Sequence, residues 1–461
     1  MSRLVIVSNR VAVPGHRGDA QGGVATGLLE ALRHDGGLWF GWNGRLAEAK
    51  PTVPALAQDA AITFALTPLT RREFDGYYIG FANRCLWPVF HAQLHLMRFD
   101  PSALVVYLEV SARWAGALAP LLKEDDLVWV HDYHLIPLGS ALRQREVKAP
   151  LGFFLHTPFP GVDLLRALPE QACLLKQLLS YDLIGFQTSL DCQSFYRALG
   201  FFLPEAHRES GGIRYAGRLT RVESFPIGID VAAVSHLARS GQNNRHGQRL
   251  RTSLTGRRLI LGVDRLDYSK GLANRFRAYA RLLERWPGFQ RRVVLLQIAP
   301  LSRTEVPEYG EIRRELNAIV GDIHARYAEY DWMPLRYMTR GFPRSTILGF
   351  LRQAEVGFIT PLRDGMNLVA KEYVAAQDPE APGVLVLSSL CGAAQELEEA
   401  LIVNPYDTEQ MAQALAQALG MELMERRARH EAMMARLTRQ DIRRWAASFR
   451  EALESSVSPP L

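Results

Sequence analysis

The 461-residue sequence predicts an α/β fold, with parallel sheets and crossover helices distributed over two domains. Short apolar runs of strand length recur along the chain. Each run precedes an amphipathic stretch of helix length, which is the pattern of strand–helix–strand units. The runs are continuously apolar, as expected of parallel strands that are buried on both faces. A chain of this length ordinarily forms two domains or three, so one small module is excluded.

The predicted strands form two series. The first series consists of residues 4–8, 127–130, 152–155, 183–186 and 222–226. The second series consists of residues 259–263, 293–298, 335–338, 356–360, 384–387 and 401–403. A polar, glycine-bearing stretch within residues 230–258 separates the series and is typical of a domain boundary. We therefore expect an N-terminal domain over residues 1–238 and a C-terminal domain over residues 239–439.

Composition and charge exclude several classes of protein. Apolar residues make up 48% of the chain and charged residues 22%, which are ordinary globular values. Continuous apolar runs stay far below the roughly 18 residues that cross a bilayer, and the N-terminus lacks the features of a signal peptide. We expect a cytoplasmic protein with no membrane partner. The net charge of +6 comes without a basic block, which favours anionic small molecules over nucleic acid as partners.

Several common motifs are missing from the sequence. No glycine pair has G-x-G spacing, so a nicotinamide-dependent oxidoreductase is not supported. The phosphate-binding loop of nucleotide kinases is missing as well. The four cysteines have no C-x-x-C spacing, so neither a disulfide framework nor a zinc site is indicated, and we expect them to be buried fillers. No Asp-x-Asp pair is present, so protein cations must neutralise any bound diphosphate.

The most informative segment is DRLDYSKG, residues 264–271, which follows the strand at 259–263 and begins a helix. Loops at the ends of parallel strands bind ligands in open α/β sheets. Arg265 and Lys270 can converge on one anionic group, beside a helix N-terminus. The alternative is a turn in which these cations pair with the aspartates of their own segment.

Residues 360–373 repeat the layout of strand, glycine-bearing loop and helix. Asn367 and Leu368 fall at the predicted helix start, where backbone N–H groups can hold a phosphate. Glu372 lies about one turn further along and can accept both hydroxyls of a ribose. Asp364 can bind sugar hydroxyls or stabilise positive charge. In the alternative interpretation Asp364 is a turn residue and Glu372 is a solvated helix carboxylate.

The N-terminal domain offers complementary groups. Arg10, at the end of the first strand, is well placed to clamp a second anion. Aromatic residues with polar neighbours gather at residues 39–44, 77–78, 87–88, 129–134 and 154–160, as in sugar-binding surfaces. Within this set, His131 and His134 are either site residues or satisfied structural histidines. In the C-terminal domain, Arg303 follows a strand and either reaches a ligand anion held by Arg10 or is a surface arginine.

Together these segments resemble the bacterial family of UDP-forming, retaining glycosyltransferases that make trehalose 6-phosphate. The most specific elements are residues 39–42, 86–88, 129–134, 153–156, 264–271 and 362–373. The resemblance runs from residue 2 to about residue 445. It implies the GT-B fold, in which two Rossmann-like domains carry parallel sheets facing a central cleft. It also implies that a C-terminal helix at about 440–457 packs back on the N-terminal domain.

The resemblance implies an activity and its partners. The N-terminal domain should bind the acceptor, glucose 6-phosphate, and the C-terminal domain the donor, UDP-glucose. Glucose is then transferred with retention by a front-face mechanism, without metal ion or cofactor, giving trehalose 6-phosphate and UDP. The implied setting is trehalose biosynthesis in the cytoplasm under osmotic stress, by a homo-oligomer that is a dimer or tetramer. The alternative is a related transferase with another phosphorylated acceptor, similar to glucosylglycerol-phosphate synthase.

The resemblance also implies a role for each matching residue. The expected catalytic residues are Arg265, Lys270, Asp364 and His156, of which the last two grip the transferred glucose. The remaining donor-binding residues are Gly23, Asn367, Leu368, Val369 and Glu372, with Glu372 on the ribose. The expected acceptor-binding residues are Arg10, Trp42, Tyr78, Trp87, Asp132 and Arg303.

Overall fold

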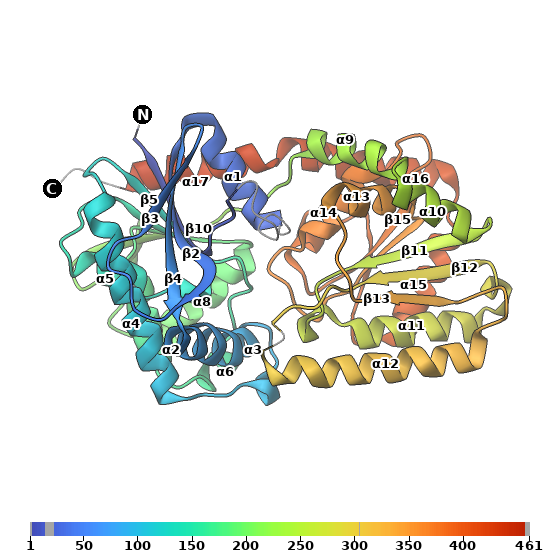
Figure 1. Cartoon of the computed structure of the whole chain (residues 1–461), viewed down its shortest axis with the longest axis horizontal. Helices are drawn as coiled ribbons and strands as arrows, with labels where there is room; N and C mark the ends of the chain where they lie inside the picture. Colours follow the sequence, from blue (N-terminus) through green and yellow to red (C-terminus); the bar gives the residue numbers. More distant parts are fainter. Residues whose placement is uncertain (1, 14–22, 304, 457–461) are drawn as a thin grey trace. The chain divides into compact units, whose positions relative to one another are not determined.

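The computed structural model describes residues 2–13, 23–303 and 305–456. These residues form two compact units (Figure 1). Unit 1 extends to Ile227 and resumes at Ile442, and unit 2 runs from Gly228 to Asp441. Each unit contains one sheet that is mainly parallel, surrounded by helices, so the predicted α/β fold class is confirmed.

The sheet of unit 1 has ten strands in the order β3-β4-β2-β1-β5-β6-β7-β10-β9-β8. The strands are β1 (Leu4–Arg10), β2 (Gly37–Ala47), β3 (Ala55–Asp59), β4 (Ile62–Thr70), β5 (Leu127–His131), β6 (Leu151–Phe154), β7 (Leu183–Phe186), β8 (His207–Glu209), β9 (Gly212–Tyr215) and β10 (Arg218–Ser224). In this order, every pair of neighbouring strands between β4 and β10 is parallel. Strand β1 lies between β2 and β5, with Val5 opposite Leu38 and Val128. Every strand predicted in the first series is present.

Five strands of unit 1 were not predicted: β2, β3, β4, β8 and β9. Ala57 of β3 is half-buried, and the other residues of β3 and β8 are exposed, because these strands lie at the two edges of the sheet. An exposed edge strand has no buried face and therefore no apolar pattern to detect. Strand β2 carries Gly41 and Gly44 among its aromatic residues, so its sequence resembles a ligand-binding loop more than a strand.

The helices of unit 1 follow the crossover pattern. They are α1 (Gly23–Asp35), α2 (Arg71–Glu73), α3 (Trp87–Phe90), α4 (Pro101–Leu118), α5 (Leu138–Arg143), α6 (Val162–Arg166), α7 (Gln171–Leu178), α8 (Ser189–Phe202) and α17 (Ile442–Ser456), with the π-helix η1 (Phe74–Leu86). Residues 101–121 would meet the length and hydropathy of a membrane span. In unit 1, however, α4 packs against η1 and α5, as the core helix of a globular unit does.

Helix α17 completes the core of unit 1 from the far end of the chain. The ring of Phe449 stacks on Trp129 of β5 with centroids 4.3 Å apart, and Trp445 lies 4.7 Å from the same ring. Gly152 of β6 and Gly185 of β7 make room for this contact, because a Cβ atom at Gly152 would lie 2.7 Å from the Phe449 ring, and at Gly185 2.8 Å. The apolar face of α17 is thus fitted to the middle of the sheet.

The sheet of unit 2 has six parallel strands in the order β13-β12-β11-β14-β15-β16. They are β11 (Arg258–Val263), β12 (Val293–Ile298), β13 (Leu335–Met338), β14 (Val356–Ile359), β15 (Val384–Ser388) and β16 (Leu401–Val403). All strands predicted in the second series are present. Because the strands are parallel, the loops that follow β11, β12, β14 and β15 emerge at one edge of the sheet.

Helices cover both faces of the unit 2 sheet. They are α9 (Val231–Gln242), α10 (Arg245–Leu254), α11 (Leu272–Arg285), α12 (Pro307–Tyr327), α13 (Arg344–Gln353), α14 (Leu368–Ala376), α15 (Thr408–Gly420) and α16 (Leu423–Arg439). Helices α11, α12 and α15 lie on one face, and α9, α10 and α13 lie on the other (Figure 1). The four cysteines are free thiols; Cys85, Cys192 and Cys391 are buried as expected, and Cys173 is half-buried.

Candidate functional site

Backbone contacts join the two predicted ligand loops of unit 2. The N–H of Leu362, after β14, donates to the carbonyl oxygen of Ser269, after β11, at 2.7 Å. Gly271 has φ +66°, and a Cβ atom there would lie 2.5 Å from the Thr360 carbonyl oxygen. A glycine is therefore required where the loops meet. Segments that are about 90 residues apart in sequence form one surface at the carboxyl ends of β11 and β14.

Lys270 and Asp364 form the centre of this surface. Nζ of Lys270 donates to Oδ2 of Asp364 at 2.5 Å, and Nδ2 of Asn367 donates to the same oxygen at 3.0 Å. Asn367 is the N-cap of α14: its Oδ1 accepts the Ala370 N–H at 3.2 Å. Leu368 and Val369 then occupy the first turn, whose backbone N–H groups have no acceptor within the helix. A cation, a carboxylate and a helix N-terminus thus lie together.

The aspartates of residues 264–271 are held by other elements. Asp264 forms a buried ion pair with Arg275 of α11, and burial raises the pKa of Asp264. Asp267 accepts the Ser269 N–H at 3.0 Å and the Tyr309 hydroxyl at 2.8 Å. Lys270 therefore ion-pairs across the two loops, with Asp364, rather than with the aspartates of its own segment.

Glu372 has a specific cationic partner. Nη2 of Arg344, the first residue of α13, donates to Oε1 of Glu372 at 3.0 Å. Burial raises the pKa of the Glu372 carboxyl, and the Arg344 charge opposes that rise. The carboxylate is thus not the solvated helix residue of the alternative interpretation.

Arg303 and Arg265 are two further cations at this edge of unit 2. Arg303 follows β12 with φ +51°, and its Nη1 donates to the Tyr309 hydroxyl at 2.9 Å. The same nitrogen lies 3.6 Å from Oδ2 of Asp267. The side chain of Arg303 is only 7% exposed, so it is not the surface arginine of the alternative interpretation. Arg265, directly after Asp264, is exposed.

Aromatic rings and one arginine gather in unit 1. The Arg10 guanidinium carbon lies 5.7 Å from the Trp42 ring centroid. Gly44 gives this guanidinium room, because a Cβ atom there would lie 2.6 Å from Arg10 Nη2. Tyr78 lies 5.6 Å from Trp42 and stacks on the His134 ring at 5.9 Å. Unit 1 thus brings three of the predicted acceptor residues together.

The π-helix η1 positions Tyr78 and leads directly to Trp87. π-Helices are rare and are frequently found at functional sites. Buried Asn83 donates to the Tyr78 carbonyl oxygen at 2.8 Å and accepts the Tyr133 hydroxyl at 2.9 Å. Trp87 begins α3, and its ring lies 3.9 Å from that of His91. The hydrogen bond between Asn83 and Tyr133 thereby links η1 to the segment after β5.

Asp132 and His156 meet at the ends of β5 and β6. Asp132 has φ +75°, and its Oδ1 accepts the His156 N–H at 3.3 Å. His156 Nε2 lies 3.1 Å from Nδ1 of His131. Burial lowers the pKa of His156 to about 3 and that of His131 well below its ordinary value. Both imidazoles are therefore neutral at pH 7.

Gly23, the remaining predicted donor residue, is the first residue of α1. Residues 14–22, which precede it, lie outside the described part of the chain.

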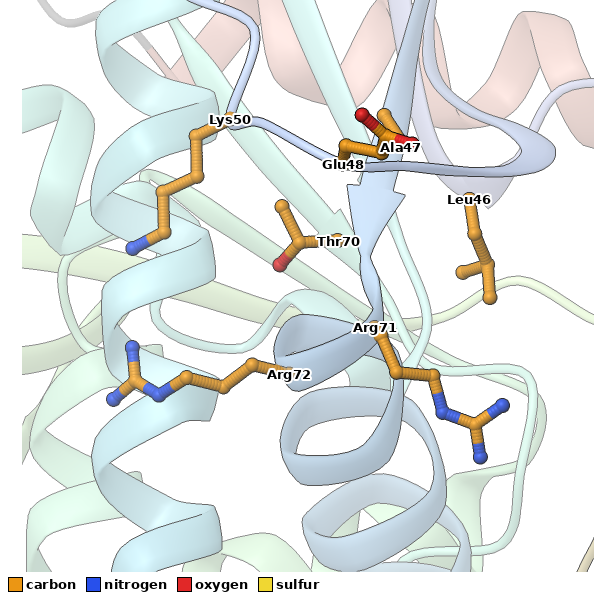
Figure 2. Close-up of a pocket in the computed structure, with 7 residues that line it drawn as sticks. All are labelled: Leu46, Ala47, Glu48, Lys50, Thr70, Arg71 and Arg72. Carbon is orange, nitrogen blue, oxygen red and sulfur yellow. The ribbon is translucent and has the colours of Figure 1, made fainter.

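Two surface hollows of about 560 Å³ lie elsewhere in unit 1. Figure 2 shows the first, where Lys50, Arg71 and Arg72 surround the end of β2 and the start of α2. Its arginines are paired, Arg71 with Asp75 and Arg72 with Glu109. The second hollow is lined by β8–β10 residues and by Ser455 and Ser456. Neither hollow is lined by a predicted site residue.

Three residues that form hydrogen-bond contacts with predicted site residues were not predicted from the sequence. Gln187 contacts His156 and directly follows β7, so the strand-end rule that found His131 also applies to it. No sequence pattern points to Arg344 or Asn83. Each contacts its partner from a helix whose position in the fold cannot be predicted from the local sequence.

The profile of Glycosyltransferase family 20 matches residues 2–455. The chain belongs to this family. It is 46% identical over 461 residues to a trehalose-6-phosphate synthase of Klebsiella pneumoniae, covering 100% of this chain and 96% of the relative. The chain is thus a glycosyltransferase, and the family resemblance stated from its sequence is confirmed.

Solved structures of relatives confirm the GT-B fold of this family 20 enzyme. An alpha,alpha-trehalose-phosphate synthase (UDP-forming) of Burkholderia xenovorans, in complex with glucose-6-phosphate, has a TM-score of 0.95 at 46% identity. That match covers 98% of this chain and 100% of the other. An E. coli structure bound with UDP-2-fluoro glucose has a TM-score of 0.94 at 44% identity, covering 100% of both chains.

Proposed function

We propose that this enzyme transfers glucose from UDP-glucose to glucose 6-phosphate and releases trehalose 6-phosphate and UDP. The observation that carries this proposal is the similarity over the whole chain to one structure that holds glucose-6-phosphate and another that holds a UDP-glucose analogue. The same similarity does not favour the alternative with another phosphorylated acceptor.

The donor is proposed to bind at the loop surface of unit 2. Lys270 and Arg265 neutralise the diphosphate, which needs no metal ion when two protein cations are at hand. The backbone N–H groups of Leu368 and Val369, at the start of α14, face the same anion and add the helix dipole. Glu372, oriented by Arg344, accepts the ribose hydroxyls. Further donor contacts are assigned to Asn367, to Asp364 and His156 on the transferred glucose, and to Gly23.

The acceptor is proposed to bind the residues that gather in unit 1. Arg10 supplies a bidentate cation for the phosphate of glucose 6-phosphate. Trp42 and Tyr78 form an aromatic wall of the kind that packs against sugar rings. Asp132, whose φ of +75° is set by the turn after β5, accepts sugar hydroxyls. Trp87 completes the aromatic wall, and Arg303 supplies a second cation for the phosphate.

The proposed chemistry retains the configuration of the transferred glucose by reaction on one face. The bond from the anomeric carbon to the diphosphate oxygen breaks as the acceptor hydroxyl forms its new bond on the same side. The hydroxyl proton passes to the leaving diphosphate oxygen. Negative charge grows on the diphosphate during this step, so Arg265 and Lys270 stabilise the transition state more than the ground state.

The remaining proposals concern the setting of the enzyme. We propose a cytoplasmic homo-oligomer, a dimer or tetramer, with these two small molecules as partners and without a nucleic-acid or membrane partner. The net charge of +6 supports anionic substrates.

The test is UDP release from UDP-glucose, with and without glucose 6-phosphate, in the presence of EDTA, with NMR identification of the sugar product. We expect release that depends on the acceptor and an α,α-1,1-linked disaccharide phosphate. Release that is unaffected by the acceptor, or that EDTA abolishes, would contradict the proposal. Assays with other phosphorylated acceptors, and with ADP-glucose and GDP-glucose, would measure the acceptor and donor specificity.

A further inference from the structure

The side-chain amide of Gln187 has a fixed orientation in unit 1. Gln187 follows β7 and is 2% exposed. The Ile227 N–H donates to its Oε1 at 3.1 Å. A backbone N–H can only donate, so the amide oxygen must face it and the NH₂ group must face the other way. That NH₂ group lies 3.5 Å from Nδ1 of His156.

The orientation of Gln187 determines where the His156 proton sits. An NH₂ group can only donate, so the facing Nδ1 of His156 must carry a lone pair. A neutral imidazole has one proton, which then lies on Nε2. Nε2 is 3.1 Å from Nδ1 of His131, so His156 donates and His131 accepts there. His131 in turn carries its proton on Nε2. Burial keeps both rings neutral by lowering both pKa values.

Ring packing holds the two imidazoles in this arrangement. The His131 and His156 rings stack at 5.3 Å with an interplanar angle of 27°. Trp129 lies 4.6 Å from the His131 ring, and Trp445 of α17 lies 6.2 Å from the His156 ring. The packing fixes the ring planes, and the hydrogen bond fixes which way each ring is turned, because rotation of either imidazole by half a turn would exchange a nitrogen for a carbon at the shared contact.

We propose that His131 and Gln187 are positioning residues that hold His156 in its Nε2–H tautomer, so that Nδ1 accepts a hydrogen bond from a hydroxyl group of the transferred hexose. The contact of Nδ1 with Gln187 is long at 3.5 Å, so Nδ1 can also accept a shorter hydrogen bond from a sugar hydroxyl while the NH₂ group still faces it. His156 then orients the sugar as an acceptor and does not act as a general acid. This inference rests on the proposed function, which assigns His156 to the glucose.

The first test reads the tautomer directly in the free, full-length enzyme. Long-range ¹⁵N–¹H correlation spectra of ¹⁵N-histidine-labelled protein distinguish Nδ1–H from Nε2–H, and a His156→Gln variant identifies the His156 signals. We expect the Nε2–H pattern in the natural enzyme. In Gln187→Glu the new carboxylate needs a proton on Nδ1, so His156 should switch to Nδ1–H. An Nδ1–H pattern in the natural enzyme, or an unchanged tautomer in Gln187→Glu at a pH at which the new carboxyl is ionised, would overturn the inference.

The second test separates positioning from packing. His131→Phe keeps a flat ring but removes the acceptor at Nδ1, whereas His131→Asn keeps an acceptor, Oδ1, close to that place. We expect KM for UDP-glucose to rise about tenfold in His131→Phe, with kcat changed less, and to recover in His131→Asn. Equal losses in both variants would mean a purely structural role. Exposed His95, changed to Asn, is the control. If the natural enzyme releases no UDP, the proposed function fails, while the tautomer spectra still decide this inference.

Discussion

Nζ of Lys270 donates a hydrogen bond to Oδ2 of Asp364 at 2.5 Å, and both side chains are largely buried. The cation that is proposed to hold the diphosphate is therefore already paired with the carboxylate that is proposed to hold the sugar. A diphosphate that reaches Lys270 competes with Asp364 for the same ammonium group. Two predictions follow from this competition, one for each partner.

Lys270→Ala should chiefly damage turnover of the donor. Loss of one cation from the leaving group should lower kcat about a hundredfold, with a smaller effect on the KM of glucose 6-phosphate. Arg303→Ala is the matched comparison and should chiefly raise the KM of glucose 6-phosphate. Steady-state kinetics with each substrate varied would check both variants, with exposed Lys148→Ala as a control. Unchanged turnover in Lys270→Ala would refute the diphosphate assignment.

Asp364→Asn should have opposite effects on nucleotide binding and on turnover. Without the carboxylate, Lys270 no longer has to leave an ion pair, so UDP alone should bind about fivefold more tightly, which corresponds to about 1 kcal/mol. Glucosyl transfer should fall, because the sugar loses a charged contact. Calorimetric titration with UDP and a turnover assay on the same sample would check this. Weaker binding of UDP by Asp364→Asn would argue against competition for Lys270.

Binding of UDP should weaken on acidification through the titration of Glu372. Burial raises the pKa of this carboxyl above its ordinary value of 4.5, so the ionised form that accepts the ribose hydroxyls is lost at a higher pH than usual. The dissociation constant should rise as the pH falls through the raised pKa of Glu372, which is above the pH at which an exposed glutamate would be protonated. Glu372→Gln should bind weakly with a flatter pH dependence. Arg344→Ala should shift the dependence to higher pH, since it removes the charge that opposes the rise.

His156 should make the protein less stable in mild acid. Its pKa in the folded protein is about 3, against an ordinary value of 6.5. Between these values the unfolded chain binds a proton that the folded protein does not, so stability is lost as the pH falls below 6.5. The loss from pH 7 to pH 5 should be roughly 1 to 2 kcal/mol for this group. Urea unfolding of His156→Gln should show a smaller pH dependence than the natural protein, and His95→Asn should match the natural protein.

Gly152→Ala should destabilise unit 1 by displacing α17. The new Cβ atom would lie 2.7 Å from the Phe449 ring, which is enclosed by Trp129 and Gly185 and has little room to move. Overpacking of this kind costs about 1–3 kcal/mol. Gly161→Ala is the matched control, because nothing lies within 4 Å of its Cβ position and its φ of −64° suits any residue. Equal thermal unfolding of the two variants would mean that α17 does not need this fit.

Every predicted strand is present. These strands could be predicted because a parallel strand that is buried on both faces is continuously apolar, which a short segment of sequence shows. The helix starts at Leu272 and Leu368 were likewise predictable, because a glycine and an asparagine directly precede them. In the structure, Gly271 and Asn367 both have a positive φ. The missed strands β3 and β8 are the exposed edges of a sheet, where neighbours supply the pairing and the side chains supply no signal.

Much of the candidate site was also predictable, because residues at the carboxyl ends of parallel strands meet at one edge. The local sequence was enough to predict two α/β units and the residue types of the site: cations and a helix start in unit 2, and aromatic rings with an arginine in unit 1. The pairing of these residues could not be predicted: Lys270 with Asp364, Arg344 with Glu372, and His156 with both His131 and Gln187. The physical reason is that local patterning follows the chain, whereas hydrogen bonds and ion pairs depend on distances of a few ångströms between elements that are far apart in sequence.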